Sequence, residues 1–331
     1  MIQFLYVEKE AFDYPIAKNI LKRFANLPII PIERYGEVFN RANQNFRLQK
    51  NHLGLILAKK YGAFLHAIPS HFGIGSEHNF YFSHILNCPF DCSYCFLQGL
   101  YRSAYFVLFV NYEDFQNEIQ RKIAESTGSI TFFSGYDGDS LALEPITGFL
   151  QEFLPFFQKI PVANIELRTK SITIKSLLTF PSPLPNCIVA YSLNPANIID
   201  KFEKKTPPLT KRLACLQALQ QRGWPIGLRF DPILLVEDFE KEYSALFEKT
   251  FTSLSTSSIH SVTLGSLRLP KSVFRNMHKN EPSHPLLATL SEENSLYTYS
   301  DTIEKKLMQK CLHMLLQYIS KERIFLCNNL F

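Results

Sequence analysis

The sequence predicts an α/β protein built on a mostly parallel sheet. From about residue 79, short apolar runs rich in β-branched and aromatic residues alternate with stretches of helical periodicity. This alternation is typical of βαβ units, whose strands run parallel. The 331 residues, 46% hydrophobic and 20% charged, provide a large core. They exclude a small disulfide scaffold and wholesale disorder.

Six strand-like runs are expected in this region, with helices between them. The runs are Asn79–Leu86, Ser129–Tyr136, Asn164–Thr169, Cys187–Leu193, Ile226–Phe230 and Ile259–Leu264. The expected helices are Tyr112–Ala124, Pro145–Gln158, Thr210–Arg222 and Val236–Leu254. Gly223 follows the third helix as a C-cap should. Six such repeats form either an open sheet or a partial barrel, and periodicity alone does not choose.

The flanking segments lack this alternation. Soft boundaries near Ser76 and Leu267 divide the chain into an N-terminal extension (1–75), a central part (76–267) and a C-terminal extension (268–331). The run Tyr105–Asn111 is a seventh strand-like stretch, interpreted as an excursion from the repeats. Beyond the second boundary, Ser283–Asn294 is expected to be a loop and Asp301–Lys321 a long amphipathic helix.

Charge and hydropathy indicate where the protein is located and which classes of partner it could bind. The formal net charge of +5 permits a polyanionic partner without requiring one. No apolar run approaches the ~18 residues that span a bilayer. The first apolar stretch meets Glu8 before it is long enough for a signal core. We therefore expect a cytoplasmic protein with no membrane partner.

The N-terminal extension carries a basic stretch in which Glu37 is the one acid after Arg34. This pattern is typical of a solvated helical surface, or of an arm that contacts a nucleic-acid backbone. The basic residues are Arg34, Arg41, Arg47, Lys50, Lys59 and Lys60.

The strongest chemical signal is a group of three cysteines, Cys88, Cys92 and Cys95, spaced C-x3-C-x2-C. They follow the first expected strand, at the C-terminal edge of the sheet, where α/β enzymes place their sites. Seven cysteines, an odd number, do not indicate a secreted disulfide framework. Three thiolates on a [4Fe–4S] cluster leave one iron open to a small molecule.

Three alternatives compete with such an open cluster. The cysteines could be free and buried, although three within eight residues by chance is improbable. A zinc ion could take His84 or His78 as its fourth ligand. An ordinary four-ligand cluster could take a distant cysteine.

The spacing, with an aromatic residue before the last cysteine, resembles the signature of the radical S-adenosylmethionine (SAM) superfamily. Further segments are similar, in order, to the spore photoproduct lyase family of DNA-repair enzymes. They are Asn87–Gln98, Glu166–Ser171, Ala190–Asn194, Phe202–Leu213 and Gly223–Pro232. The resemblance implies a partial (β/α)6 TIM-like barrel with N- and C-terminal extensions.

It also implies a function. A [4Fe–4S] cluster would pass an electron to SAM, and the resulting 5′-deoxyadenosyl radical would abstract hydrogen from a pyrimidine lesion in DNA. The implied partners are UV-damaged DNA and an electron donor such as a flavodoxin or ferredoxin. Two alternatives remain: a radical SAM enzyme acting on RNA or a small molecule, and a non-catalytic zinc and nucleic-acid-binding module.

The resemblance assigns the three cysteines to the cluster and places Tyr94 beside the adenine of SAM. It also assigns Lys170, Ser192 and Asn194 to SAM, although a surface lysine and strand-end caps would give the same residues. Gly135 would let the backbone approach a ligand, and Asp137 could receive an ammonium group; both also suit a plain turn.

The chain departs from the family at two positions. Tyr136 aligns with a cysteine that donates hydrogen to the product radical, and Phe96 aligns with a tyrosine on the proposed radical return path. Tyr136 is therefore our candidate catalytic residue, as a phenol in place of a thiol. The departure concerns the specific reaction and does not touch the cluster assignment.

Charged residues further along suggest contacts with the substrate. A basic stripe, three of whose members are four residues apart, would lie on one helix face and could follow DNA phosphates; a solvated face is the alternative. Its members are Arg268, Lys271, Arg275 and Lys279. Arg229 and Asp231 end the fifth run, either to bind substrate or to form a structural ion pair.

Overall fold

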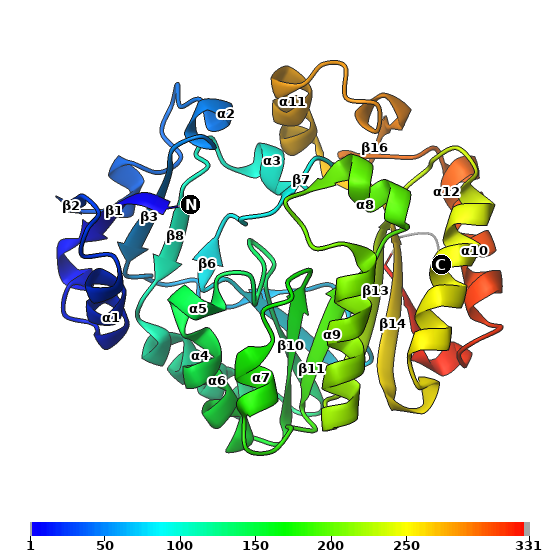
Figure 1. The fold of residues 1–331 in the computed structure, drawn as a ribbon, viewed down its shortest axis with the longest axis horizontal. Helices are drawn as coiled ribbons and strands as arrows, with labels where there is room; N and C mark the ends of the chain where they lie inside the picture. The colour runs from blue at the N-terminus through cyan, green and yellow to red at the C-terminus, as the bar shows by residue number, and fades with distance from the viewer. Residues whose placement is uncertain (1, 328–331) are drawn as a thin grey trace.

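The computed structural model describes residues 2–327, and its centre is a curved sheet of eight strands (Figure 1). The strand order is β18-β14-β13-β11-β10-β9-β5-β4, and all neighbours pair in parallel except β4 with β5. The strands are β4 (His66–Ala67), β5 (His78–Phe82), β9 (Ile130–Ser134), β10 (Ala163–Thr169), β11 (Cys187–Ser192), β13 (Ile226–Ile233), β14 (Ile259–Ser266) and β18 (Ile324–Leu326). The six predicted runs thus contain the successive strands of a partial barrel. The first run, expected over Asn79–Leu86, ends as a barrel strand at Phe82, and Ile85–Leu86 pairs in a different sheet.

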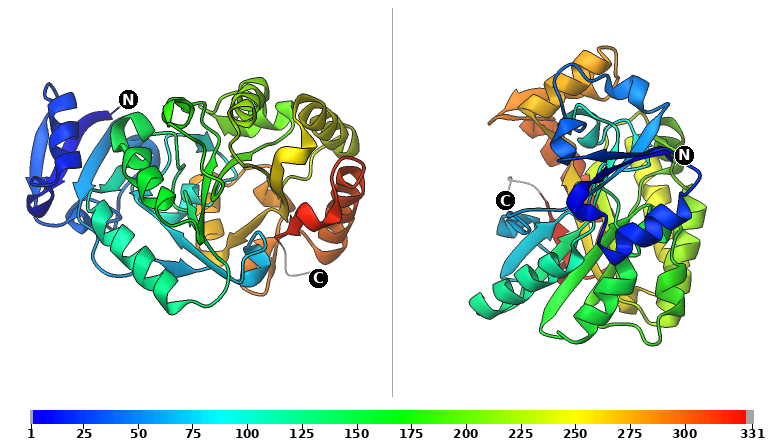
Figure 2. Two further views of the ribbon diagram at one scale, coloured as in Figure 1. Left: turned by 90° about the horizontal axis from the view of Figure 1, so that it is seen from below. Right: turned by 90° about the vertical axis from the view of Figure 1, so that its left-hand side faces the viewer.

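Helices cover the outer, convex face of this sheet, and its inner face is not covered by them (Figures 1 and 2). They are α4 (Tyr112–Glu125), α5 (Glu144–Thr147), α6 (Phe149–Gln158), α7 (Lys175–Thr179), α9 (Leu209–Arg222) and α10 (Phe239–Ser253). Strand β11 is buried at every residue, as expected for a parallel strand covered on both faces. Helix α9 ends at Gly223, whose φ of +96° confirms the predicted C-cap.

Two predicted helices have different bounds. The expected helix Pro145–Gln158 is two helices, because Gly148 between them adopts the left-handed φ of +60°. A residue in that conformation cannot continue a right-handed helix. Helix α10 begins at Phe239 rather than Val236, since Asp238 before it is also left-handed, at φ +54°.

The N-terminal extension forms a second sheet at one end of the barrel (Figures 1 and 2). Its order is β2-β1-β3-β8-β6, with β1 (Ile2–Glu8), β2 (Ile29–Ile32), β3 (Leu53–Ala58), β6 (Ile85–Leu86) and β8 (Phe106–Phe109). Short helices α1 (Pro15–Arg23) and α2 (Phe46–Gln49) accompany it. The run Tyr105–Asn111 is therefore a strand of this sheet, and the basic stretch is mostly not helical. Pairing of β3 with β8 crosses the boundary expected near Ser76.

The C-terminal extension also departs from expectation. The expected loop Ser283–Asn294 contains β16 (Ser291–Glu293), which pairs with β17 (Leu296–Thr298), itself paired with β15 (Arg268–Pro270). Helix α12 (Asp301–Leu315) ends before the expected Lys321. The chain then returns as β18 to extend the barrel sheet beside β14. Helix α11 (Lys271–Asn280) lies above the barrel mouth (Figure 1).

Within residues 2–327, we find no helix with the length and apolar character needed to cross a bilayer.

Candidate active site at the mouth of the barrel

The three cysteines lie on a loop that is fixed by pairing with a distant segment. In this loop, β7 (Asp91–Cys92) pairs antiparallel with β12 (Glu203–Lys204), which follows helix α8 (Ala196–Phe202). The amide of Ser93 donates to the Phe202 carbonyl at 2.8 Å. The Gln98 amide, on helix α3 (Leu97–Leu100), donates to the Cys92 carbonyl at 3.0 Å. The loop therefore has a defined shape at the C-terminal edge of the sheet.

All three thiols are free, with Cys92 buried and Cys88 and Cys95 half-buried. Burial raises the pKa of each, and the charges of Cys92 and Cys95 add to the rise at Cys88. The Lys170 ammonium acts in the opposite direction on the pKa of Cys92 and Cys95. A cation therefore stands beside the thiols, where it would stabilise thiolates.

The donor set fits a [4Fe–4S] cluster better than a single ion. Soft thiolates are the ligands of iron–sulfur clusters, and each binds a different iron of the cube. Within residues 2–327, no three His, Cys, Asp or Glu side chains converge as one metal ion would require. In addition, two buried amide oxygens, Asn87 Oδ1 and Asn194 Oδ1, have no hydrogen-bond partner among the described residues. A bound group with N–H donors would satisfy them.

The histidines of the zinc alternative point elsewhere. His84 stacks on Phe149, with ring centres 3.9 Å apart, and its burial lowers its pKa to about 3. His78 starts β5, so it lies at the opposite end of the strand from the cysteines, and its Nε2 is 2.8 Å from the Thr127 carbonyl. Neither side chain completes a zinc site with the cysteine loop.

Tyr94 and Asn194 meet at a buried carboxylate, Glu203. The Tyr94 hydroxyl donates to Glu203 Oε1, and Asn194 Nδ2 donates to the same oxygen at 2.9 Å. Arg212 donates to the other oxygen. Burial opposes ionisation of Glu203, but Lys170 and Arg212 hold its pKa below the ordinary value. The Lys170 ammonium lies 5.8 Å from the centre of the Tyr94 ring.

Ser192 is the remaining residue expected at this rim. It ends β11 and is 6% exposed, and its carbonyl accepts from Arg212 at 3.1 Å. The structure therefore gathers Tyr94, Lys170, Ser192 and Asn194 around one polar network beside the thiols.

The loop after β9 is shaped by Asp139. One oxygen of this carboxylate accepts the Thr169 hydroxyl at 2.6 Å, and the other accepts the Lys170 amide at 2.7 Å. Gly135 has φ +84°, and a Cβ there would lie 2.5 Å from Ser140 Oγ. Glycine is thus required by the close packing of the loop itself.

Tyr136 and Asp137 lie in a cleft of about 790 Å³ between the barrel and the N-terminal sheet. Asp137 accepts the Ser83 hydroxyl at 2.6 Å, and burial raises its pKa. Tyr136 is 50% exposed and stacks on Tyr81, with ring centres 4.2 Å apart. Phe96 follows the last cysteine, and its ring centre lies 5.3 Å from that of Tyr136. Tyr136 therefore joins the cysteine loop to this cleft.

The basic stripe is only partly free. Arg268 is tied to Asp231 at 3.3 Å, and Lys271 pairs with Glu292 of β16. Arg275 and Lys279 are exposed on α11, with no ion pair to any described residue. The sequence placed no acid within this stripe, but the fold brings two carboxylates to it from other strands.

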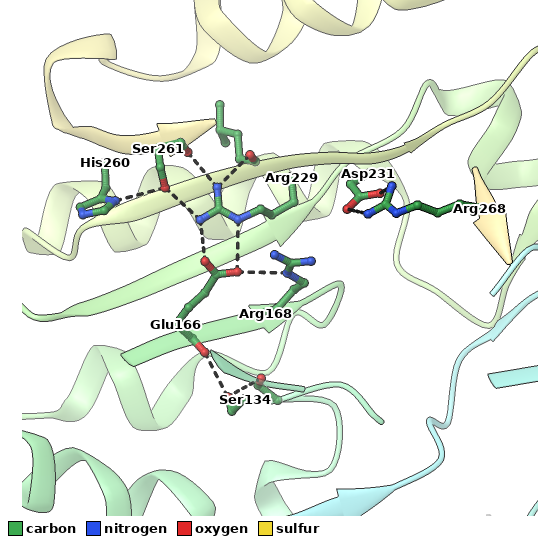
Figure 3. Close-up of polar contacts among 10 residues, drawn as sticks. Ser134, Glu166, Arg168, Arg229, Asp231, His260, Ser261 and Arg268 are labelled. Carbon is green, nitrogen blue, oxygen red and sulfur yellow. Dashed lines mark hydrogen bonds and ion pairs between the residues drawn. The ribbon is translucent and has the colours of Figure 1, made fainter. Parts of the chain in front are cut away.

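Arg229 and Asp231 do not pair with each other (Figure 3). The fully buried Arg229 points into the barrel, where Nη2 donates to Glu166 Oε2 at 2.7 Å and to Ser261 Oγ at 2.9 Å. Burial opposes ionisation of Glu166, but Arg229 and Arg168 hold its pKa at about 2. Of the two alternatives, each residue forms a structural ion pair, but with a partner from a more distant strand: Arg229 with Glu166 of β10 and Asp231 with Arg268 of β15.

Comparisons with known proteins agree on one family. A family model described as spore photoproduct lyase matches residues 1–311. The chain is 26% identical over 307 residues to the spore photoproduct lyase of Bacillus subtilis (strain 168), covering 90% of this chain and 86% of that protein. It is also 26% identical over 263 residues to that of Clostridium acetobutylicum, covering 77% and 75%.

The fold agrees as well. A solved variant of spore photoproduct lyase with bound S-adenosylmethionine and dinucleoside spore photoproduct matches with a TM-score of 0.83 at 20% identity, covering 99% of this chain and 98% of that one. The chain belongs to the spore photoproduct lyase family. The fold similarity spans both extensions, and the two extensions are thus part of the family's fold.

Sequence reasoning missed several residues of this family member's site. Glu203 and Arg212 lie in the segment Phe202–Leu213, which was recognised by its similarity alone. Their charge was visible in the sequence, but Tyr94, which donates to Glu203, lies 109 positions before it, and no local pattern relates the two. Asp139 was visible in the loop after β9, but only the structure distinguishes its role from that of Asp137.

Proposed function

We propose that this chain is a radical SAM enzyme of the spore photoproduct lyase type, acting on a pyrimidine lesion in DNA. The observation that carries the proposal is the loop of three free thiols, held at the barrel mouth beside Lys170. When bound, a [4Fe–4S] cluster and SAM would supply the 5′-deoxyadenosyl radical for hydrogen abstraction.

Each group of residues would have its own part in the reaction. Cys88, Cys92 and Cys95 hold the cluster. Lys170 offers its ammonium to the carboxylate of SAM, since charge-assisted hydrogen bonds are strong in a half-buried site. The other positions proposed to contact SAM are Tyr94, Gly135, Asp137, Ser192 and Asn194.

Tyr136 is proposed to give the hydrogen atom of its hydroxyl to the substrate radical, from the cleft side of the loop. The tyrosyl radical left behind would be returned to the phenol by one electron from the flavodoxin or ferredoxin and one proton from solvent. The position of Tyr136 beside Phe96 and its half-exposed ring support this role. The pairing of β7 with β12 and the network around Glu203 would limit the access of water to Cys92, the buried thiol of the three.

For the substrate, we propose that Arg275 and Lys279 contact DNA phosphates. Arg268 and Lys271 belong to the same basic stripe, but their charges are paired with Asp231 and Glu292. A flavodoxin or ferredoxin would deliver the electron. The barrel of residues 76–267 would carry the cofactors, and the extensions 1–75 and 268–331 would shape the mouth.

The test is formation of 5′-deoxyadenosine. The protein is reconstituted with iron and sulfide without oxygen, reduced, and given SAM with UV-irradiated or unirradiated DNA. We expect product that increases with irradiated DNA and disappears in the variant with all three cysteines replaced by alanine. Product that ignores the DNA would contradict the lesion substrate, and no product from the cluster-loaded protein would contradict the activity.

A further inference from the structure

The proposed function gives no role to the basic stretch of the N-terminal extension. In the structure, some of its residues form ion pairs and others line a cleft. Lys50 pairs with Asp91, Arg47 with Glu281 and Lys59 with Glu10. Arg34 and Lys60, in contrast, line the cleft between the N-terminal sheet and the barrel.

Lys60 is placed firmly in this cleft. Its amide donates to Asn111 Oδ1 at 2.8 Å, and its carbonyl accepts Asn111 Nδ2 at 2.9 Å. The ammonium lies 5.1 Å from the centre of the Phe109 ring and has no ion pair with a described residue. Burial lowers the pKa of Lys60, and the charge of Asp137, also in the cleft, acts in the opposite direction. The anchored backbone and unpaired ammonium are features of an anion contact.

Arg34 extends the positive wall. Its guanidinium lies 4.1 Å from the ring centre of Tyr61, beyond the end of β3. Arg34 is exposed, and Glu37 caps its backbone amide rather than its guanidinium. The guanidinium is thus stacked on Tyr61 and its charge also reaches Glu10, but it forms no ion pair within residues 2–327 and it lines the cleft.

The opposite wall is aromatic. Tyr81 covers one side of the Tyr136 ring at an interplanar angle of 27°, and half of Tyr136 stays exposed. An unstacked base gains stabilisation on such a ring whatever its sequence, because every base has a π-face. A volume of about 790 Å³ is within the range of small-ligand pockets.

We propose that the N-terminal sheet forms one wall of the substrate site: a nucleotide's base stacks on Tyr136, and its phosphate is bound by Lys60 and Arg34. This inference rests on the proposed function and names the residues that would hold the DNA strand. Asp137 also lines the cleft, where it accepts the Ser83 hydroxyl at 2.6 Å and forms no ion pair with Lys60.

The test compares two adjacent lysines. Lys60→Gln and Lys59→Gln remove the same charge, but only Lys60 lines the cleft. Binding of fluorescein-labelled single-stranded oligothymidylate to the cluster-loaded protein is measured by anisotropy, without oxygen, over a series of salt concentrations. For single strands, each phosphate contact contributes about −0.7 to the slope of log K against log salt. We expect Lys60→Gln to flatten the slope by about that amount and Lys59→Gln to leave it unchanged.

The aromatic wall is tested with Tyr136→Ala and Tyr136→Phe. The alanine variant should bind the same oligonucleotide about tenfold more weakly, as expected for a lost stacked base, and the phenylalanine variant should bind like the parent. Circular dichroism checks that both variants are folded. Equal salt slopes for the two lysine variants would overturn the cleft assignment while the parent still binds DNA. Failure of the parent to bind DNA would instead overturn the proposed substrate class.

Discussion

At the scale of single residues, the barrel interior depends on charges that neutralise one another. Glu166 and Arg229 are both fully buried, and Glu166 also receives Arg168 Nε at 3.0 Å (Figure 3). Glycine makes room for this pair: a Cβ at Gly227 would lie 2.6 Å from Arg229 Nη2. Breaking such a pair is costly, because the remaining charge is buried without compensation.

We expect Glu166→Gln to lower the free energy of unfolding at neutral pH by about 3–5 kcal/mol. The pKa of Glu166 is lowered from 4.5 to about 2 in the folded protein, so its stabilisation is complete above pH 4.5 and is lost as the pH falls towards 2. The parent should therefore lose about 3 kcal/mol of stability over this pH range through protonation of Glu166, and the variant should not. Urea unfolding at several pH values measures it.

Glu152 is an exposed residue of α6, and Glu152→Gln is the control. This variant should keep the pH dependence of stability of the parent protein. A Glu166→Gln protein that loses stability between pH 4.5 and 2 as steeply as the parent would contradict the assignment.

At the scale of elements, three distant segments hold the cysteine loop. Strand β12 pairs with β7, and Lys50 from the N-terminal extension bonds Asp91 and Gln98 of the loop. Helix α11 packs against α3, where Asn276 Nδ2 donates to the Gly99 carbonyl at 2.9 Å. The position of the thiols is therefore decided by both extensions as well as by the barrel.

The α3–α11 contact requires glycine at position 99. A Cβ there would lie 2.4 Å from the Val273 carbonyl oxygen, a backbone atom that cannot move aside cheaply. Gly99→Ala should therefore cost about 1–3 kcal/mol of unfolding free energy, measured by urea denaturation, and should lower the iron bound after reconstitution. Gly36→Ala is the matched control, since nothing lies within 4 Å of its Cβ position. Similar stabilities for the two variants would show that α11 does not press on α3.

The exposed face of α11 gives a prediction about DNA. Arg275 and Lys279 have no described ion-pair partner, whereas Lys271 has Glu292. The double variant R275Q/K279Q should weaken binding to duplex DNA and reduce its salt slope by about 1.8, from −0.9 per contact. Lys271→Gln should have less effect, because its charge is already neutralised. Titration by anisotropy at several salt concentrations distinguishes them, and a larger effect of Lys271→Gln would reverse the assignment.

At the scale of the whole molecule, the two sheets are interlocked by the order of the chain. The chain completes three strands of the N-terminal sheet, begins the barrel sheet with β4 and β5, and then returns to add β6 and β8 before β9. All four residues of β8 are buried, so the N-terminal sheet and the barrel cannot be separated by one cut in the sequence. The inter-sheet cleft exists only in the assembled chain.

Removal of residues 1–75 should therefore leave β8 without its partner β3 and expose an apolar strand edge, which promotes aggregation. We expect residues 76–331 to be insoluble or to elute as large species in size-exclusion chromatography. A monomeric fragment with one cooperative unfolding transition would contradict this and favour independent folding of the barrel.

The sequence by itself determined the alternation of strands and helices, the cap at Gly223 and the loop of Cys88, Cys92 and Cys95. These features depend on periodicity and spacing between near neighbours, which a chain displays without folding. The tertiary structure alone decided which charges meet. The Tyr94 hydroxyl donates to Glu203, Arg229 pairs with Glu166 and not with Asp231, and Lys60 and Tyr136 line the same cleft. A buried charge must be paired with an opposite charge, and the partner can come from any strand that the fold brings close. The positions of the residues in the sequence therefore do not predict which charges pair.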